Sequence, residues 1–251
     1  MLLEVAMSKI LRDISIEKQI TKHMQRWEMT RAEWARQTRV AQQPLPGKFG
    51  PYITISREYG SGGTELSHLL AEKFGWHVFD REIIEAIAGR THAREELVAR
   101  FDEHRQNAMD TYLRNLFTGQ RFDNTQYLYH LSQVLLSLAH NGNAVILGRG
   151  ANFVLPPEAG LRVRVTAPLA LRCVRVMHEL SCDEKKALQE INRRDKERKD
   201  FLQRQFHVPA DDACAYDVTI NTAQIEMTAA ADLLIRLVEA KLKPVESRAE
   251  A

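Results

Sequence analysis

The stretch ITISREYGSGGT, residues 53–64, decides the fold of this chain. Its first half belongs to the β-branched run Tyr52–Ser56, which predicts a short buried strand, and its second half contains the glycine-rich turn Gly60–Gly63. An amphipathic helical pattern begins at Thr64. A strand, a glycine loop and a helix in this order predict an anion site, because bare backbone N–H groups and a helix N-terminus can face the same phosphate.

The loop departs from the phosphate-binding pattern GxxxxGK(S/T) at two of its fixed places. Gly62 matches the second glycine and Thr64 the hydroxyl residue, but Arg57 stands at the first glycine and Gly63 at the lysine. The hydroxyl of Thr64 is placed to reach a magnesium ion. If the lysine's place is merely vacant, Gly63→Lys should raise ATP turnover. We predict that the phosphates of ATP are held by Arg57, Gly60, Ser61, Gly62, Gly63 and Thr64. A flexible turn is the alternative that the loop alone leaves open.

Short apolar runs alternate with longer helical patterns after residue 50. This alternation favours right-handed crossovers and one parallel sheet covered by helices on both faces, which is an α/β fold. Residues 82–141 are too many for a simple crossover and predict a helical insertion, and the polar, basic segment 183–207 separates the fourth strand from the fifth. The predicted strands are Tyr52–Ser56, His77–Phe79, Ala144–Leu147, Arg162–Thr166 and Asp217–Asn221.

Two more of these strands end in charged side chains. The segment VILGRGANFVLP, residues 145–156, places Arg149 at the carboxyl end of the third strand, where it faces the same crevice as the glycine loop. Its planar guanidinium suits a phosphate dianion, although Arg149 could instead cap a surface turn. Arg81 is predicted to hold an acceptor phosphate. Asp80 is predicted to order magnesium-bound water or an acceptor group, or else to cap the helix that begins at Glu82.

Basic residues gather between residues 162 and 204. This segment contains twelve Lys or Arg and seven Asp or Glu, although the whole chain carries a formal net charge of only +2. Spacing places Arg194 and Arg198 on one helix face, with Asp195 available to orient them. We predict that this segment closes over the donor and that the two arginines neutralise charge on the transferring phosphoryl group. A solvated helix face is the alternative.

Composition limits the class of protein. A chain of 251 residues, 44% hydrophobic and 27% charged, predicts one principal folded domain. Residues 8–40 lack Gly and Pro and predict a long amphipathic helix, which either packs on its own domain or contacts a partner or a second copy. No signal peptide or membrane span is recognisable, and the basic residues are not interleaved with aromatic ones. We therefore expect a cytoplasmic protein that binds neither membranes nor nucleic acid stably.

The strand, loop and helix segments after residue 50 resemble the cytidylate kinase-like family both in their sequences and in the order in which they occur. The resemblance covers roughly residues 50–240 and implies a P-loop NTPase fold of the nucleoside-monophosphate kinase type, with three α/β/α layers around a five-stranded parallel sheet. It also implies an acceptor-binding insertion at 82–141 and a lid at 183–207. We expect these within a kinase-like domain at 51–243, preceded by a helical extension at 1–43 and a linker at 44–50 and followed by a tail at 244–251. The resemblance is carried by ITISREYGSGGTELSHLLAEKFGWHVFDREII, VILGRGANFVLP, RVRVTAP, INRRDKERKDFL and YDVTINT.

The resemblance implies phosphoryl transfer from ATP, with Mg²⁺, to a nucleoside monophosphate, and CMP or dCMP is the favoured acceptor. Cytidylate kinases carry a lysine where Gly63 stands and a GRD triplet where this chain ends its triplet with Gly150. Two alternatives therefore stay open: a nucleotide-binding regulatory or scaffold module, and a small-molecule kinase with a non-nucleotide acceptor. The implied roles are catalysis by Arg149, Arg194 and Arg198, acceptor binding by Asp80, Arg81 and Arg149, and magnesium binding by Thr64 and Asp80.

Overall fold

The structure is a computed structural model of the whole chain. It describes residues 49–89, 91–99, 106–107, 109–113 and 125–242, together with 22, 24–26 and 29. The predictions of a linker before residue 49 and of a tail at 244–251 lie outside these residues, as does most of the predicted N-terminal helix. The described residues within that helix are helical, and Met24 packs against the core.

The sheet has five parallel strands in the order β2-β3-β1-β4-β5. Its central strand β1 pairs with β3 on one side, Tyr52 opposite Ala144, and with β4 on the other, Tyr52 opposite Gly160. The first strand in the chain thus lies in the middle of the sheet, and the glycine-rich loop leaves from its carboxyl end. The strands are β1 (Tyr52–Arg57), β2 (His77–Phe79), β3 (Ala144–Leu147), β4 (Gly160–Thr166) and β5 (Val218–Asn221).

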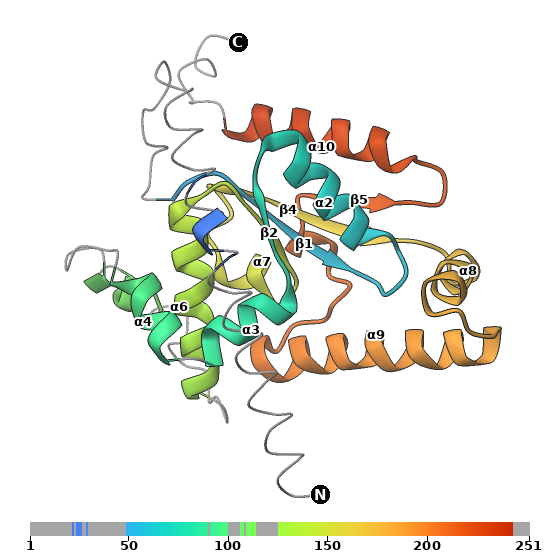
Figure 1. Cartoon of the computed structure of the whole chain (residues 1–251), viewed down its shortest axis with the longest axis horizontal. Helices are drawn as coiled ribbons and strands as arrows, with labels where there is room; N and C mark the ends of the chain where they lie inside the picture. The colour runs from blue at the N-terminus through green and yellow to red at the C-terminus, as the bar shows by residue number, and fades with distance from the viewer. Residues whose placement is uncertain are drawn as a thin grey trace, which may run out of the picture.

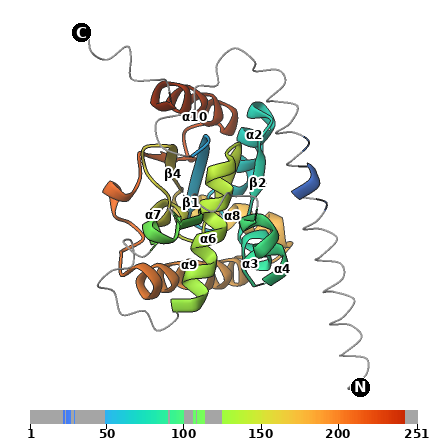
Figure 2. The same ribbon diagram turned by 90° about the vertical axis from the view of Figure 1, so that its left-hand side faces the viewer.

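Helices cover both faces of the sheet (Figures 1 and 2). Helices α2 (Gly63–Phe74) and α10 (Met227–Leu242) pack on one face over Ile53 and Ile55 of β1. On the other face α3 (Arg81–Gly89), α6 (Thr125–Asn141) and α7 (Ala151–Val154) pack over Tyr52. Alternate β1 side chains point to opposite faces, so the strand is buried on both, as a parallel sheet requires.

Two helices lie outside these layers, at the carboxyl ends of the strands. Helix α8 (Leu169–Leu180) follows β4 and packs against α9 (Glu184–Phe206), which runs along the bottom of the molecule in Figure 1. The Asp183 side chain caps α9 by accepting a hydrogen bond from the Lys186 N–H at 2.8 Å. The predicted lid at 183–207 is therefore one continuous helix with its two caps.

The strand predictions agree with the structure to within two residues. The runs His77–Phe79 and Ala144–Leu147 match β2 and β3 at both ends, whereas β4 begins two residues before the predicted start, at Gly160. The insertion at 82–141 is helical where it is described: α3, α4 (Thr91–Val98), residues 106–107 and 109–113, and α6. Among the described residues, every helix is too short or too polar to cross a lipid bilayer.

Candidate active site

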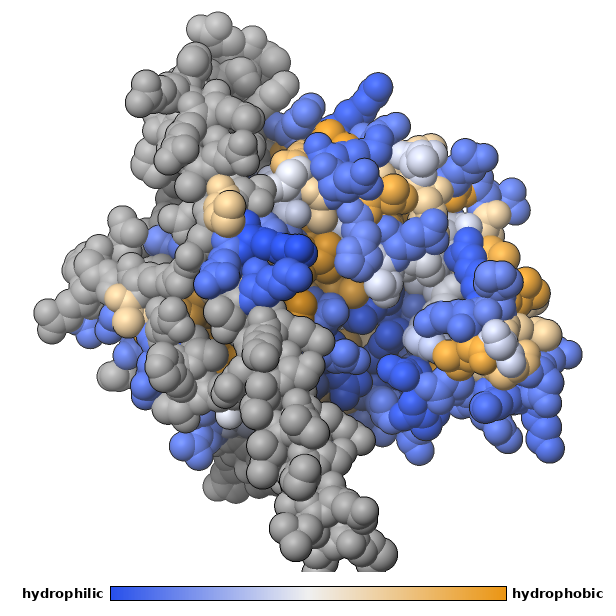
Figure 3. Space-filling model, viewed as in Figure 1, coloured by the Kyte–Doolittle hydropathy of each residue, from blue (hydrophilic) through white to orange (hydrophobic). Residues whose placement is uncertain are grey.

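A pocket of about 740 Å³ lies between the carboxyl ends of the strands and helix α9. Ser56 and Arg57 of β1, Asp80 after β2, Leu147 of β3 and Arg164 of β4 line it. The wall opposite the sheet is α9, whose surface is mostly hydrophilic in the space-filling view (Figure 3). Ten Arg or Lys and six Asp or Glu line the pocket, so its formal charge favours anions.

Arg57, the last residue of β1, is a poorly compensated cation in this pocket. Its Nε is buried and has no hydrogen-bond partner in the described part of the chain. Its guanidinium lies against Gly148, because a Cβ added to that glycine would be 2.5 Å from Arg57 Nη1. Burial, and then the nearby cations Arg198 and Arg149, lower the pKa of Arg57 from 12.5 to about 9. An anion bound here would relieve this unfavourable charge.

The Arg57 side chain also occupies the place beside Gly63. A Cβ added to Gly63 would lie 2.7 Å from Arg57 Cβ and 3.0 Å from its Cγ. Because Cβ is fixed to the backbone of β1, it cannot swing aside as the end of a side chain could. The space that a Cβ at residue 63 needs is therefore taken by Arg57, so the place of the P-loop lysine is not merely vacant, which is the condition on which a gain from Gly63→Lys depends.

The glycine loop itself is packed more tightly than its sequence suggests. Gly60 and Gly62 have positive φ angles of 78° and 84°, and a Cβ on Gly60 would be 2.9 Å from Arg172 O. Ser61 is buried, and its hydroxyl donates to Glu58 O at 2.8 Å. Of the six residues predicted to hold ATP, Arg57 and Thr64 line the pocket, whereas Gly60, Ser61, Gly62 and Gly63 do not.

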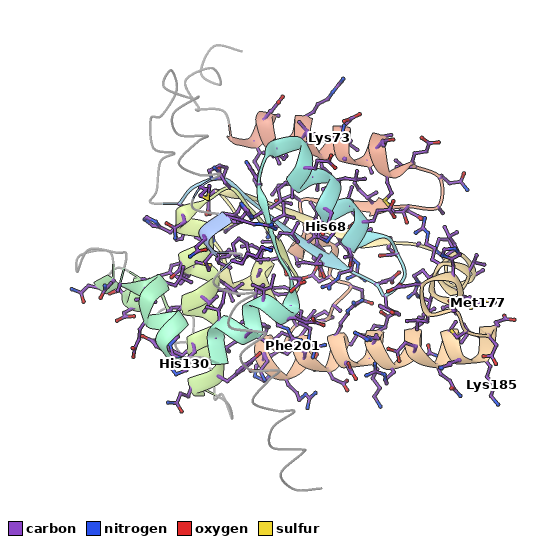
Figure 4. All side chains as sticks on the ribbon, in the orientation of Figure 1. His68, Lys73, His130, Met177, Lys185 and Phe201 are labelled. Atoms are coloured by element: carbon purple, nitrogen blue, oxygen red, sulfur yellow. The ribbon has the colours of Figure 1, made fainter. Side chains whose placement is uncertain are left out.

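Arg149 lies where the third strand turns into α7. It has a positive φ of 53°, between Gly148 and Gly150, and its side chain is 10% exposed. Its Nη1 lies 2.9 Å from Glu85 Oε1, and its guanidinium stacks 4.6 Å from the ring centroid of Phe201 on α9. Phe201 is labelled in Figure 4. Burial lowers the pKa of Arg149, and Glu85 opposes this shift. Arg149 thus faces the pocket instead of capping a surface turn.

Asp80 and Arg81 both reach the pocket, with different partners. Asp80 Oδ1 accepts a hydrogen bond from the Ile83 N–H at 2.9 Å, so this carboxylate caps α3, which begins at Arg81 and not at Glu82. Arg81 is 44% exposed, and its Nε lies 3.4 Å from Glu85 Oε2. Glu85 therefore spaces Arg81 from Arg149 and keeps both guanidinium groups beside the pocket.

The two arginines predicted on α9 lie over the loop that follows β1. The guanidinium carbons of Arg194 and Arg198 are 5.2 and 5.6 Å from the ring centroid of Tyr59. Arg194 Nε donates a 2.7 Å hydrogen bond to Glu190 Oε1, which raises the pKa of that arginine. Burial lowers the pKa of Arg198, although the Asp195 carboxylate opposes this shift.

Two pocket residues, Glu58 and Arg172, were not predicted from the sequence. Glu58 Oε2 accepts a hydrogen bond from Thr166 Oγ1 at 2.7 Å, which ties the loop to the end of β4. Arg172 on α8 is 9% exposed and donates to Tyr59 O at 3.1 Å. A signal for Arg172 was present, because it shares the buried face of α8 with Cys173 and Val176.

Magnesium fits this pocket only together with a phosphate ligand. Within the described ranges no group of three or more His, Cys, Asp or Glu could hold a metal ion. The candidate oxygen ligands are the exposed Thr64 hydroxyl and the Asp80 carboxylate, one oxygen of which already caps α3. Since Mg²⁺ commonly combines one or two protein oxygens with substrate phosphates and water, this sparse set suits an ion that arrives with a nucleotide.

Comparison with known proteins agrees with the α/β fold. The sequence profile of the cytidylate kinase-like family matches residues 52–224, more than half of the chain. The chain belongs to the cytidylate kinase-like family. The match begins at β1 and ends just after β5, so the family's domain contains the complete sheet and the pocket. The α/β fold is that of the P-loop kinases, as its parallel order 2-3-1-4-5 indicates.

Individual relatives of this cytidylate kinase-like chain are distant. A curated cytidylate kinase from Staphylothermus marinus is 27% identical over 105 residues, which span 42% of this chain and 59% of that protein. A solved structure of an uncharacterised protein from Eubacterium ventriosum is 20% identical, with a TM-score of 0.52, and the match covers 75% of this chain and 98% of that one. A shikimate kinase from Acinetobacter baumannii, solved with shikimate, is 15% identical with a TM-score of 0.39, and the match covers 78% and 97% of the two chains.

Proposed function

We propose that this protein transfers a phosphoryl group from ATP to a nucleoside monophosphate in the cytoplasm, with CMP or dCMP as the favoured acceptor. The observation that carries the proposal is the cluster of Arg57, Arg149 and Arg198 around one pocket, in which the buried Nε of the partly buried Arg57 has no hydrogen-bond partner among the described residues. A phosphate is the natural partner of such a cluster, because guanidinium groups bind its oxygens through paired hydrogen bonds. Family membership supports the same class of reaction.

In this proposal each residue aligns or neutralises a phosphate. Arg57 and Thr64 hold the donor phosphates, and Arg149 with Arg81 holds the acceptor phosphate. Arg194 and Arg198 approach the transferring group from α9. The acceptor phosphate is already anionic near neutral pH, so no general base is needed, and catalysis consists of alignment and charge stabilisation. Thr64, with Asp80 nearby, would hold a magnesium ion, which when bound would neutralise part of the charge on the donor phosphates.

A regulatory nucleotide-binding module is a second candidate, favoured by one observation. The residues of the glycine loop from 60 to 63 do not line the pocket, so most of the backbone N–H groups that usually hold a donor lie outside it. Such a module would bind nucleotide without turnover. A kinase with a non-nucleotide acceptor would differ from the nucleotide kinase only in which acceptor stimulates ADP release.

The test is magnesium-dependent ADP release from ATP with CMP, dCMP, UMP, AMP, shikimate or no acceptor. It is run on the wild type, on Arg149→Met, and on Arg236→Met as a matched control. Arg236 is an exposed arginine of α10 that does not line the pocket. We expect one pyrimidine monophosphate to stimulate release and Arg149→Met to lower kcat/KM for that acceptor by roughly ten- to a hundredfold, because a charge-assisted hydrogen bond is lost.

Each alternative gives a different result in this assay. Nucleotide binding without ADP release for any acceptor would favour the regulatory module. Release driven by shikimate and by none of the nucleotides would favour a non-nucleotide acceptor. If Arg236→Met and Arg149→Met lower kcat/KM equally, the pocket arginine has no specific role in the reaction.

A further inference from the structure

Helix α9 is docked on the loop after β1 through its middle turns. Asp195 Oδ1 accepts a hydrogen bond from the Tyr59 N–H at 2.8 Å, and Arg198 Nη1 donates to Arg57 O at 3.1 Å. The guanidinium groups of Arg194 and Arg198 stack on the Tyr59 ring. The helix that was expected to close over the donor is thus docked on this loop, and its Asp195 carboxylate bonds to the N–H of Tyr59, the residue just before the glycine turn Gly60–Gly63.

The partners of Asp195 are the kind of donors that a phosphate oxygen uses. Its Oδ2 lies 2.6 Å from Arg172 Nη1 and its Oδ1 lies 3.6 Å from Arg198 Nη1, so one backbone N–H and two guanidinium groups surround the carboxylate. Arg172 is itself fixed by donating to Ala167 O and Tyr59 O, both at 3.1 Å. Asp195 and Arg172 line the same pocket as Arg57 and Thr64. A backbone amide beside an arginine is a common anion cradle, and here the chain's own carboxylate fills it.

We propose that Asp195 is a built-in counter-anion: in the nucleotide-free protein it holds the Tyr59 N–H and Arg172, and a phosphate of the nucleotide displaces it. This inference rests on the proposed nucleotide binding. It adds that the Asp195 carboxylate and a phosphate of the nucleotide compete for the same donors. The Tyr59 N–H and Arg172 thus have an anionic acceptor both without and with nucleotide. When the phosphate replaces Asp195, the middle of α9 is released from the loop. If Asp195 is seated in nine of ten molecules, the apparent affinity for nucleotide is about tenfold weaker than the intrinsic affinity.

Glu197 provides a matched control for the charge of Asp195. It lies on the same helix, lines the same pocket and carries the same charge. It bonds to Arg193 Nη1 at 2.5 Å within α9 and lies 4.0 Å from Arg81, a residue of α3 and not of the loop after β1. Removing Glu197 therefore lowers the negative charge of the pocket without freeing the Tyr59 N–H.

The first experiment measures binding of the magnesium complex of the β,γ-imido analogue of ATP by calorimetry. The proteins are the wild type, Asp195→Ala, Asp195→Asn and Glu197→Gln. We expect Asp195→Ala to bind about tenfold more tightly than the wild type, as the occupancy above requires. Asp195→Asn should bind with intermediate affinity because its amide oxygen can still accept the Tyr59 N–H, and Glu197→Gln should change the affinity clearly less than Asp195→Ala.

The second experiment follows hydrogen exchange of the Tyr59 amide with and without the same analogue. In the wild type this amide should be protected in both states, because one acceptor replaces the other. In Asp195→Ala it should exchange faster without the analogue and regain protection when the analogue binds. The two states of this variant thus report the exchange of partners directly, whether or not phosphoryl transfer is measured.

The outcomes that overturn the inference are separate from those that overturn the function. If Asp195→Ala binds the analogue more weakly than the wild type, or if Glu197→Gln gains as much affinity as Asp195→Ala, then Asp195 does not compete with the nucleotide. The same follows if the analogue binds Asp195→Ala but leaves the Tyr59 amide unprotected; in each of these cases nucleotide binding itself still stands. Absence of binding to every protein, the wild type included, would overturn the proposed function and the inference together.

Discussion

At the scale of single residues, Arg57 and Gly63 are sterically coupled, because a side chain at residue 63 would compete with that of Arg57 for the same space. Arg57 stands at the place of the first P-loop glycine and Gly63 at that of the lysine, and the structure shows why the two departures occur together. The Arg57 side chain passes so close to Gly63 that no Cβ fits there. We infer that a guanidinium from the end of β1 has taken over the space, and with it the proposed phosphate-binding role, of the lysine.

This coupling predicts the outcome of exchanging the two residues. Gly63→Lys alone should lose nucleotide binding and destabilise the fold by about 1–3 kcal/mol, because its Cβ overlaps Arg57 Cβ. Arg57→Gly alone should weaken binding by roughly ten- to a hundredfold, because a cation is lost. Arg57→Gly/Gly63→Lys restores the GxxxxGK pattern and should recover part of both losses. Urea unfolding and calorimetric titration with the magnesium–ATP analogue measure the two effects.

Additive losses in the double variant would contradict this coupling. Gly63→Ala is the control for steric overlap, since it adds the same Cβ without a charge. If Gly63→Ala folds and binds like the wild type, the space beside Arg57 is more accommodating than the 2.7 Å contact indicates.

The sequence predicted four charged pocket residues at or just after the ends of strands, although it missed Glu58, which directly follows β1. Arg57, Asp80, Arg81 and Arg149 all lie at carboxyl ends of parallel strands, and the topology brings such ends together. The remaining contacts depend on tertiary packing that no local pattern encodes. Asp195, for example, bonds to an amide 136 residues away in the chain, which only the docked position of α9 makes possible.

At the scale of elements, α9 is stabilised along its own length as well as by docking. Glu190 accepts hydrogen bonds from Arg193 Nη2 at 2.6 Å and from Arg194 Nε at 2.7 Å. The network fixes Arg194 where it stacks on Tyr59. The sequence placed Arg194 and Arg198 of segment 183–207 on one helix face, and spacings of three and four residues between opposite charges favour a continuous helix, which the structure has.

This network makes a pH-dependent prediction. Hydrogen bonds from Arg193, and then from Arg194, lower the pKa of Glu190 from 4.5 to about 2. A lowered carboxyl pKa stabilises the folded state fully above the unfolded pKa and loses its effect as pH falls towards the folded one. Glu190→Gln should therefore lower the free energy of unfolding by roughly 0.5 kcal/mol at pH 7, a modest value because these pairs are solvent-exposed. The difference should shrink below about pH 4.5 and vanish near pH 2.

Urea unfolding of the wild type and Glu190→Gln at a series of pH values measures this difference. Glu72→Gln, which changes an exposed carboxylate on α2, controls for the general loss of a negative charge. A difference between the wild type and Glu190→Gln that stays constant from pH 7 to pH 3 would show that the network does not stabilise α9 through its charge.

At the scale of the whole molecule, the sheet could be predicted from the sequence because each strand is a short apolar run with a clear end. The packing of the helices was harder to predict: Leu233 belongs to an apolar pattern of α10 but is 44% exposed, whereas Leu234 and Val238 are buried. The order of the strands places all the charged strand ends at one edge, so the fold concentrates arginines in one pocket. That arrangement should cost stability when no anion is bound.

This cost predicts that Arg57→Met stabilises the nucleotide-free protein while weakening its response to nucleotide. Methionine keeps much of the apolar bulk of Arg57 and removes a buried cation that lies near Arg149 and Arg198. We expect the free energy of unfolding without ligand to rise by about 1–2 kcal/mol, the usual size of such gains at functional sites. At a ligand concentration of about 100 Kd, nucleotide binding should stabilise the wild type by about 2.7 kcal/mol and Arg57→Met by much less at the same concentration.

Scanning calorimetry with and without the magnesium–ATP analogue measures both parts of this prediction. Arg162→Met is the matched control, and it should change the stability in the opposite direction. Arg162 Nη2 lies 2.9 Å from Asp217 Oδ1, so removing this arginine breaks a partly buried ion pair. The melting temperature of Arg57→Met should exceed that of the wild type without ligand and lose this advantage with it, while Arg162→Met should melt lower in both conditions. If Arg57→Met and Arg162→Met both melt at a lower temperature than the wild type without ligand, Arg57 stabilises the nucleotide-free fold. The prediction that its charge costs stability until a phosphate binds would then be wrong.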